Sequence, residues 1–431
     1  MSEPVIVPRA EHAISRKQID PDALRVLYRL HQHDFLAYLV GGSVRDLLLS
    51  RQPKDFDIGT SAHPYQVKKL FRNCWIIGRR FRLAHVRFGQ KNIEVATFRR
   101  QLSAEELAAA DAQPPTHGVP IDGNDDESRA RLLHRDNTFG TPEEDAFRRD
   151  FTINALFYDI ASFSIIDYTG GLRDLEARLI RCIGDPAERF QEDPVRMLRA
   201  VAMAARLGFS IDPPIDAAIA AHRNEIAKSA PARLIEELYK LLRSGASERA
   251  FRMLAERRLL EPIAEPLQQR CGDSLWQSLA ALDTYRRRPD VISTSLTNPL
   301  LLGSLIVPLG QGAGAPLAFR PPRSAQKEPA PSLGMLPLAR RDVDRLRQML
   351  DLQRRLLDTN LTPRARRALM HRGNFQDALI WLDVHGQAPE ALEHWRGFME
   401  AAVTFEGGTE AVDVPPRRRR RRRRRGRKPA V

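Results

Sequence analysis

The fold of this chain is decided by the stretch GGSVRDLLL at residues 41–49, which PKDFDI follows at residues 53–58. An apolar run at residues 35–40 leads into the glycine pair, and the segment after the pair is typical of a short helix. Glycines let a backbone come close to a triphosphate, and a helix N-terminus attracts anions. The order of these segments therefore predicts a strand, a tight turn and a helix that bind a phosphate group.

Two carboxylates, Asp55 and Asp57, stand one residue apart in the second of these stretches. Because strand side chains alternate between faces, we expect both to point the same way, while Phe56 and Ile58 point to the core. Exposed carboxylates on one strand repel each other, and Mg²⁺, which favours carboxylates and substrate phosphates, removes that repulsion. Glu94 is a candidate third ligand, since its apolar neighbours would take the opposite face of their strand. The pattern indicates metal-assisted nucleotidyl transfer, whereas an isolated D-x-D is usually a solvated strand face.

The chain has 431 residues, 42% of them hydrophobic, which is enough for two or three domains with their own cores. Its net charge of +14 is unevenly placed, because a run of nine arginines lies near the C-terminal end. The run consists of Arg417, Arg418, Arg419, Arg420, Arg421, Arg422, Arg423, Arg424 and Arg425. Such a run repels itself and suits a polyanion, so we expect a disordered tail that contacts nucleic acid. A solubilising or targeting tail is the alternative.

The three cysteines, Cys74, Cys182 and Cys271, are odd in number and widely spaced. They form neither a disulfide framework nor a metal motif, which fits a reducing cytosol. The first twenty residues lack the apolar core of a signal peptide, and the longest apolar stretch, residues 299–309, is too short to span a bilayer. We therefore expect a cytoplasmic protein.

Three further segments combine charge with apolar residues: GRRFRLAHV at 78–86, RRDFTIN at 148–154 and EDPVRMLR at 192–199. Arginines suit triphosphate oxygens and ribose hydroxyls, and a carboxylate beside a guanidinium offers acceptors and donors to a base edge. The first segment also suits phosphate binding with base stacking. The alternatives are a basic turn, a surface salt-bridge patch and ordinary helix-dipole compensation.

Periodicity and end signals place several elements. Residues 21–31 and 193–208 read as helices, the second opened by Asp193-Pro194 and ended by Gly208. Strands are expected at 75–77, 83–88 and 93–98, and a last strand pair at 151–167, with residues 167–171 as its turn. Helical pattern returns near residues 232–260 and 340–403.

Taken together and in this order, the motifs closely resemble the class II nucleotidyltransferases of the DNA polymerase beta superfamily, which include CCA-adding enzymes and bacterial poly(A) polymerases. The resemblance covers residues 14–260. The segment IIGRRFRLAHV at 76–86, the segment at 10–17 and the arginine tail favour the poly(A) polymerase branch. The implied fold is α+β, a mixed-sheet nucleotidyltransferase head followed by an all-α neck, body and leg.

The resemblance and the sequence pattern together suggest five segments. They are an N-terminal segment and helix at 1–32, the head at 33–168 with a long loop at 103–144, a helical neck and RNA-binding body at 169–265, a helical C-terminal domain at 266–405 with a loop or linker at 308–337, and a disordered tail at 406–431.

The implied activity is template-independent addition of AMP from ATP to RNA 3′ ends by two-metal nucleotidyl transfer, as part of RNA processing and turnover. The implied catalytic residues are Asp55, Asp57 and Asp150, with Mg²⁺ held by Asp55, Asp57 and Glu94. The implied nucleotide-binding residues are Gly41, Gly42, Ser43, Arg45, Arg149, Asp150, Asn154, Glu192, Asp193, Arg196 and Arg199. RNA would be bound by Arg79, Arg80, Arg82 and the arginine tail.

Some choices stay open at this point. Glu94 and Asp150 compete for the role of third metal ligand. One alternative function is CCA addition to tRNA, and another, of a different class, is RNA binding by a protein with an inactive head. The expected partners are RNA 3′ ends, ATP and the RNA-degradation machinery.

Overall fold

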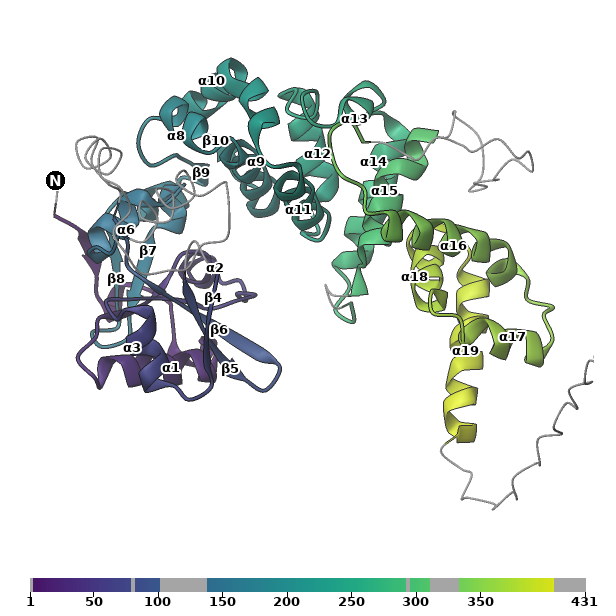
Figure 1. Ribbon diagram of the computed structural model, residues 1–431, viewed down its shortest axis with the longest axis horizontal. Coiled ribbons are helices and arrows are strands. Elements are labelled where there is room, and N and C mark those ends of the chain that lie inside the picture. The colour runs from purple at the N-terminus through teal and green to yellow at the C-terminus, as the bar shows by residue number, and fades with distance from the viewer. Residues whose placement is uncertain (1–2, 79–81, 101–137, 292–294, 311–332, 407–431) are drawn as a thin grey trace, which may run out of the picture. The chain divides into compact units, whose positions relative to one another are not determined.

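The computed structural model describes residues 3–78, 82–100, 138–291, 295–310 and 333–406 (Figure 1). The chain divides into two compact units, Met1–Pro316 with Pro322–Val343, and Leu317–Pro321 with Asp344–Val431. The expected boundaries after residues 168 and 265 fall inside the first unit. The expected RNA-binding residues Arg79 and Arg80, most of the loops at 103–144 and 308–337, and the arginine tail lie outside the described residues.

Within the described residues, the head is built on an eight-stranded sheet in the order β1-β8-β7-β2-β3-β6-β5-β4 (Figure 1). Its strands are β1 Val5–Val7, β2 Ala37–Val40, β3 Asp57–Thr60, β4 Cys74–Ile77, β5 Leu83–Phe88, β6 Lys91–Thr97, β7 Leu156–Asp159 and β8 Ser164–Asp167. Neighbouring strands are antiparallel except β3 and β6, which are parallel. The sheet is therefore mixed, and the predicted α+β class is confirmed.

The head contains five described α-helices: α1 Pro21–His31, α2 Gly42–Leu48, α3 Pro64–Leu70, α6 Pro142–Arg148 and α7 Gly171–Glu176. The predicted helix at 21–31 is confirmed. It begins there because the Asp20 carboxylate accepts hydrogen bonds from two backbone N–H groups of the first turn, and Pro21 occupies the first helical position. Helix α1 then buries Val26, Leu27 and Leu30, so its apolar stripe faces the core.

The two faces of the sheet differ near β4, β5 and β6. One face buries Ala84, Val86, Ile93 and Val95, and α3 packs against these three strands. The other face carries residues that alternate with these, among them Glu94, which is exposed. The predicted orientation of Glu94, opposite to its apolar neighbours on β6, is confirmed.

The rest of the first unit is mainly helical. Its helices are α8 Pro186–Glu192, α9 Val195–Leu207, α10 Pro213–His222, α11 Pro231–Leu242, α12 Ser247–Glu256, α13 Glu265–Gln269, α14 Asp273–Arg286 and α15 Asn298–Gly310. A two-stranded parallel pair, β9 Leu179–Ile180 with β10 Ser210–Ile211, lies beside α9. Helix α9 ends at Gly208 with φ of 78°, as predicted. It begins at Val195, two residues after the predicted start at Asp193, because Pro194 is its N-cap and Asp193 is the C-cap of α8.

The second unit contains most of α16 Arg340–Leu357, followed by α17 Pro363–Met370, α18 Phe375–His385 and α19 Pro389–Glu406. Its core includes Trp381 and Trp395, each about 1% exposed, and Trp395 Nε1 donates to the carbonyl of Leu356 at 2.8 Å. This agrees with the helical pattern expected from residue 340 onward. In the described ranges, every helix is too short or too polar to cross a membrane.

Two local expectations about loops were wrong. The polar loop expected to reach Glu144 ends earlier, because Thr141 and Glu144 form a reciprocal capping box that starts α6. Residues 308–310, expected to open the second loop, instead belong to α15, and Leu333, expected near its end, is fully buried.

Two strand expectations also differ from the structure. The turn at residues 167–171 does not join β7 to β8; instead the Asp167 carboxylate accepts four backbone N–H bonds, from residues 169–172, at the start of α7. Strand β1 was not foreseen at all. It is three residues long, and its two exposed apolar residues, Val5 and Ile6, give no alternating pattern.

Candidate active site

The glycine turn between β2 and α2 has the geometry that the sequence predicted. Gly41 has φ of 71° and ψ of −129°, a backbone conformation that side chains disfavour. A Cβ added at this position would also lie 3.0 Å from Arg149 Nη1. The backbone N–H of Gly41 donates to the carbonyl of Leu156 at 3.1 Å, which ties the turn to β7. Only glycine fits here without strain.

Most polar side chains expected to bind phosphate are instead engaged within the fold. Ser43 is buried, and its hydroxyl donates to the carbonyl of Val40 at 3.1 Å. Arg45 is 3% exposed and donates to Asp46 at 2.8 and 2.7 Å and to the side chain of Asn154. Burial lowers the pKa of Arg45, while Asp46 opposes that shift. These buried side chains therefore stabilise the turn through hydrogen bonds within the protein.

The candidate metal ligands Asp57 and Glu94 lie side by side. Strands β3 and β6 pair in parallel with Ile58 opposite Val95, so the preceding residues, Asp57 and Glu94, are neighbours. Both residues are exposed, so a ligand can reach them. The carboxylate beside Asp57 is thus Glu94, the candidate third ligand, on the adjacent strand, and not Asp55 on the same strand as predicted.

Asp55 departs from the expectation. It precedes β3, its side chain is 72% exposed, and the nearest cation is Lys54 at 3.8 Å. The last residue of β2 opposite β3 is Val40, which pairs with Asp57. The chain leaves the sheet at Gly41, so β2 offers no residue that could pair with Asp55 and include it in β3.

The electrostatics of Asp57 mark this as a site for positive charge. Although the side chain of Asp57 is open to solvent on one side, the protein packed around its carboxylate removes part of its hydration and raises its pKa to about 6. The negative charges of Glu94 and Asp55 add to the shift, while Arg149 opposes it. A cation placed here would relieve that repulsion. In the described part of the chain, however, no three His, Cys, Asp or Glu side chains come close enough together to hold a metal ion.

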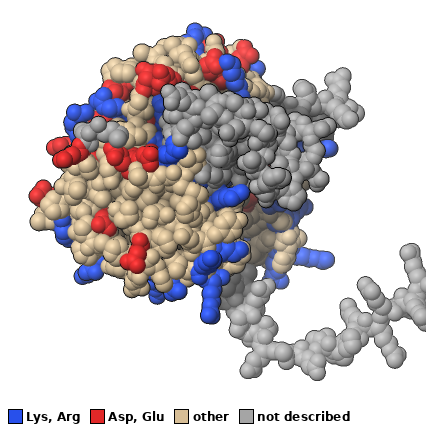
Figure 2. Space-filling model, turned by 60° about the vertical axis from the view of Figure 1, so that its left-hand side comes forward, with Lys and Arg blue, Asp and Glu red and all other residues tan. Residues whose placement is uncertain are grey.

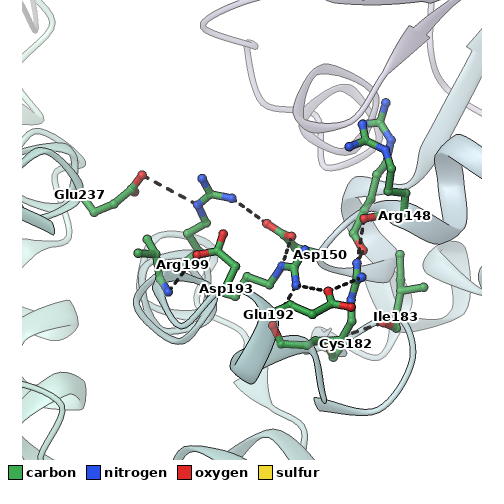
Figure 3. A network of polar contacts seen from close by, with 12 residues as sticks. Arg148, Asp150, Cys182, Ile183, Glu192, Asp193, Arg199 and Glu237 are labelled. Carbon is green, nitrogen blue, oxygen red and sulfur yellow. Dashed lines mark hydrogen bonds and ion pairs between the residues drawn. The ribbon is translucent and has the colours of Figure 1, made fainter. Parts of the chain in front are cut away.

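Asp150 contacts two arginines of helix α9 (Figure 3). Its two oxygens accept from Arg196 Nε at 2.6 Å and from Arg199 Nη1 at 2.8 Å. Burial alone would raise the pKa of Asp150, but the two arginines outweigh it and hold that pKa below its usual range. In this geometry Asp150 joins the head to α9. The structure therefore favours Glu94 over Asp150 as the candidate third metal ligand beside Asp57.

The base-reading candidates Glu192 and Asp193 are also paired. Glu192 accepts from Arg189 at 3.0 Å and from Arg196 at 2.8 Å. Asp193 accepts two bonds from Arg233 on α11, at 2.9 and 2.6 Å. Arg233 was not foreseen, because it lies 40 residues along the chain from Asp193 and no short-range pattern links them.

Comparison with known proteins finds family matches for two segments of the chain. Residues 37–181 match the family described as "Poly A polymerase head domain", and residues 208–270 match one described as "Probable RNA and SrmB- binding site of polymerase A". This part of the chain is therefore similar to a poly A polymerase head domain.

Relatives of named activity match more than half of the chain. The chain is 48% identical over 279 residues to "Poly(A) polymerase I" of Salmonella typhimurium, covering 64% of this chain and 57% of that protein. It is 41% identical over 259 residues to the protein of that name from Haemophilus influenzae, covering 60% and 54%. It is 35% identical over 253 residues to a "CCA-adding enzyme" of Bacillus pumilus, covering 58% and 57%. The chain thus spans just over half the length of the curated relatives it matches.

Solved structures show the same fold over more of the chain. The CCA-adding enzyme of Bacillus stearothermophilus in complex with CTP superposes with a TM-score of 0.56 at 23% identity, covering 89% of this chain and 83% of that one. A CCA-adding enzyme in its apo form II superposes with a TM-score of 0.54 at 18% identity, covering 95% and 89%. At these identities the likeness concerns the fold.

Two further residues position the site, one in the head and one on α8. Arg149 donates to Asp145 at 3.1 and 2.8 Å and to the carbonyl of Asn154 at 3.2 Å, so it lies fixed between Gly41 and Asp57. Arg189, which is 6% exposed, donates from Nη2 to the carbonyls of Arg148 and Arg149 at 2.7 Å each. The i,i+4 spacing of Asp145 and Arg149 was visible in the sequence, whereas the contacts of Arg189 depend on the tertiary fold.

Proposed function

We propose that the chain adds AMP from ATP to RNA 3′ ends without a template. The observation that carries this proposal is the pair Asp57 and Glu94 on neighbouring strands of a poly A polymerase head domain, with the pKa of Asp57 raised to about 6 by burial and like charge. A carboxylate pair that is destabilised without a cation suits a reaction in which positive charge must be bound. The 48% identity to a poly(A) polymerase I, against 35% to a CCA-adding enzyme, supports ATP over mixed CTP and ATP use.

The cation in this proposal is Mg²⁺, because the available donors are carboxylate oxygens. Asp57 and Glu94 would hold it, and Asp55, which precedes β3 and already acts on the pKa of Asp57, would join them. When bound, such ions stabilise the attacking and leaving oxygens of an in-line displacement. The part of this chain is to fix the two strand carboxylates side by side and to keep Arg149 close to them.

Selection of adenine is assigned in this proposal to the start of α9. Asp193 and Arg196 offer acceptors and donors, and their orientation is supported by Arg233 and by Asp150. Side chains that are already oriented lose less conformational entropy when a base binds. We further propose that residues 208–270, which match an RNA-binding family, contact the RNA. RNA-degradation proteins are the proposed partners. The cytoplasm is the proposed location, in line with three free cysteines.

One assay tests the proposal. The purified full chain is incubated with Mg²⁺, an unstructured RNA and each nucleoside triphosphate separately, and in parallel with a tRNA that lacks its 3′ CCA. A long ladder with ATP alone is expected. Extension of the tRNA only, dependent on CTP, would instead assign CCA addition. Absence of product from every substrate, with RNA still bound, would leave an RNA-binding protein with an inactive head.

A further inference from the structure

The edge strand β4 exposes two large apolar side chains. Trp75 is 52% exposed and Ile77 is 50% exposed, and because they are two residues apart they lie on the same face of the sheet. The alternate residue Cys74 is buried on the opposite face. A tryptophan left open on a sheet edge is a surface that can bind a partner.

The strand register places this apolar pair in line with the candidate carboxylates. Trp75 is opposite His85 on β5, and His85 is opposite Glu94 on β6. His85 is half-buried between them, with Nε2 3.7 Å from Glu94 Oε1. Asp57 on β3 completes the row, since it lies beside Glu94. The row therefore runs across four strands, from an exposed indole to the carboxylates.

The charges beside this row suit a nucleic-acid strand. Arg82, which directly precedes β5, and Arg87, near its end, are both exposed. Arg87 is two residues from His85 and so shares the face of the row. On the face drawn in Figure 2, acidic and basic side chains lie next to one another over the described residues. Mixed surface charge of this kind does not by itself indicate a ligand. Arginines that flank an exposed aromatic side chain are more specific, because single-stranded nucleic acid binds to surfaces that combine the two.

We propose that Trp75, supported by Ile77, stacks a base of the RNA strand whose 3′ end lies at Asp57. This rests on the proposed function, which requires a single-stranded RNA end at the carboxylates. Strands are spaced about 4.8 Å apart, so three spacings separate Trp75 from Asp57 by about 14 Å. A stacked strand advances about 3.4 Å per nucleotide, which puts the stacked base about four nucleotides from the end.

The first test measures RNA dependence at saturating ATP. Base stacking on an aromatic side chain contributes about 1–3 kcal/mol, so Trp75→Ala should raise the KM for RNA by about 5- to 150-fold and leave the KM for ATP unchanged. Trp75→Phe should restore most of the affinity. Tyr65→Ala is the matched control, because Tyr65 is an equally open aromatic residue, 61% exposed, on α3. RNA shorter than about four nucleotides should bind wild type and Trp75→Ala alike.

The second test does not depend on catalysis. Adding oligoadenylate should quench part of the tryptophan fluorescence of the wild type, and that part should be missing in Trp75→Phe, even though Trp75→Phe still binds. If the wild type extends no RNA in the presence of any triphosphate, the proposed function fails, while this quenching still decides the stacking site. An RNA KM within twofold of wild type for Trp75→Ala, or a change of oligomeric state in that variant with unchanged RNA binding, would overturn the proposal.

Discussion

Replacing Asp150 with asparagine tests whether the head and α9 are joined through this carboxylate. Asn keeps the shape of the side chain but removes its charge, so Arg196 and Arg199 lose the anion that they contact at 2.6 and 2.8 Å. The side chain of Asp150 is 21% exposed and that of Arg196 is 13% exposed, so water compensates little for the loss. We expect a clear fall in the free energy of unfolding of the first unit.

The expected size follows from the partners that remain. Removing one member of a buried ion pair costs about 3–5 kcal/mol. Arg196 still contacts Glu192 at 2.8 Å, and Arg199 is 37% exposed with Glu237 at 3.8 Å, so neither arginine is left without an anion. The loss should therefore lie at the lower end, about 3 kcal/mol.

The pH dependence of this loss has a definite sign. The pKa of Asp150 is lower in the folded protein than its ordinary value. Its ionised form therefore contributes stability that is fully present above the ordinary aspartate pKa of about 3.9, and lost as the pH falls through the lower folded value. The difference between wild type and Asp150→Asn should be constant near neutral pH and should shrink below about pH 4.

The assay is urea unfolding of the full chain, followed by circular dichroism at several pH values. Glu261→Gln provides a control in the same unit, because it removes an exposed i,i+3 pair with Arg258 and should cost less than about 1 kcal/mol. If Asp150→Asn matched this control near neutral pH while losing Mg²⁺-dependent transfer, Asp150 would be a ligand of the metal and the structural assignment would be wrong.

Three further predictions concern the charges of the site and the tail. Asp57→Asn should raise the thermal unfolding midpoint in EDTA, because it removes repulsion with Glu94, and should abolish transfer in Mg²⁺; a variant that turns over normally refutes the metal assignment. Arg233→Ala should weaken the preference for ATP over CTP by up to about fivefold, because the Arg233–Asp193 pair is exposed and such a pair contributes up to about 1 kcal/mol, and RNA affinity should stay unchanged. An unaltered preference makes the Asp193 pair structural only. Truncation after Pro416 should flatten the salt dependence of RNA binding, whose log–log slope is about −0.7 per neutralised phosphate; superimposable curves reject a tethering role.

The elements that could be predicted from the sequence are those whose signals are local. Helix α1 was predicted with the bounds it has, because a capping aspartate, a proline at the first position and an apolar stripe all lie within twelve residues. The same holds for Gly208 at the end of α9 and for strand β5. The capping box of α6 was just as local, but it lies beside a long polar stretch and was read as part of it.

The partners of the charged residues could not be predicted in the same way. The sequence gives the spacing of Glu192 and Arg196, and the structure shows that i,i+4 pair. It does not give the contact of Asp193 with Arg233, nor that of Asp150 with Arg199, because both pairs span tens of residues. The first depends on how α11 packs against the start of α9, and the second on how α9 packs against the head. The residue types therefore indicated which positions carry functional charge, but only the tertiary fold shows which residues those charges contact.

Arg45 shows why a motif residue need not touch the substrate that the motif serves. A guanidinium that is 3% exposed must be paired, since an unpaired buried charge is too costly to keep. Arg45 meets this need through Asp46 and Asn154. The carbonyl of Asn154 in turn accepts from Arg149, whose guanidinium lies against Gly41 and acts on the pKa of Asp57. We therefore expect a change at Arg45 to affect Asp57 through the turn that Arg45 supports, without any direct contact between Arg45 and phosphate.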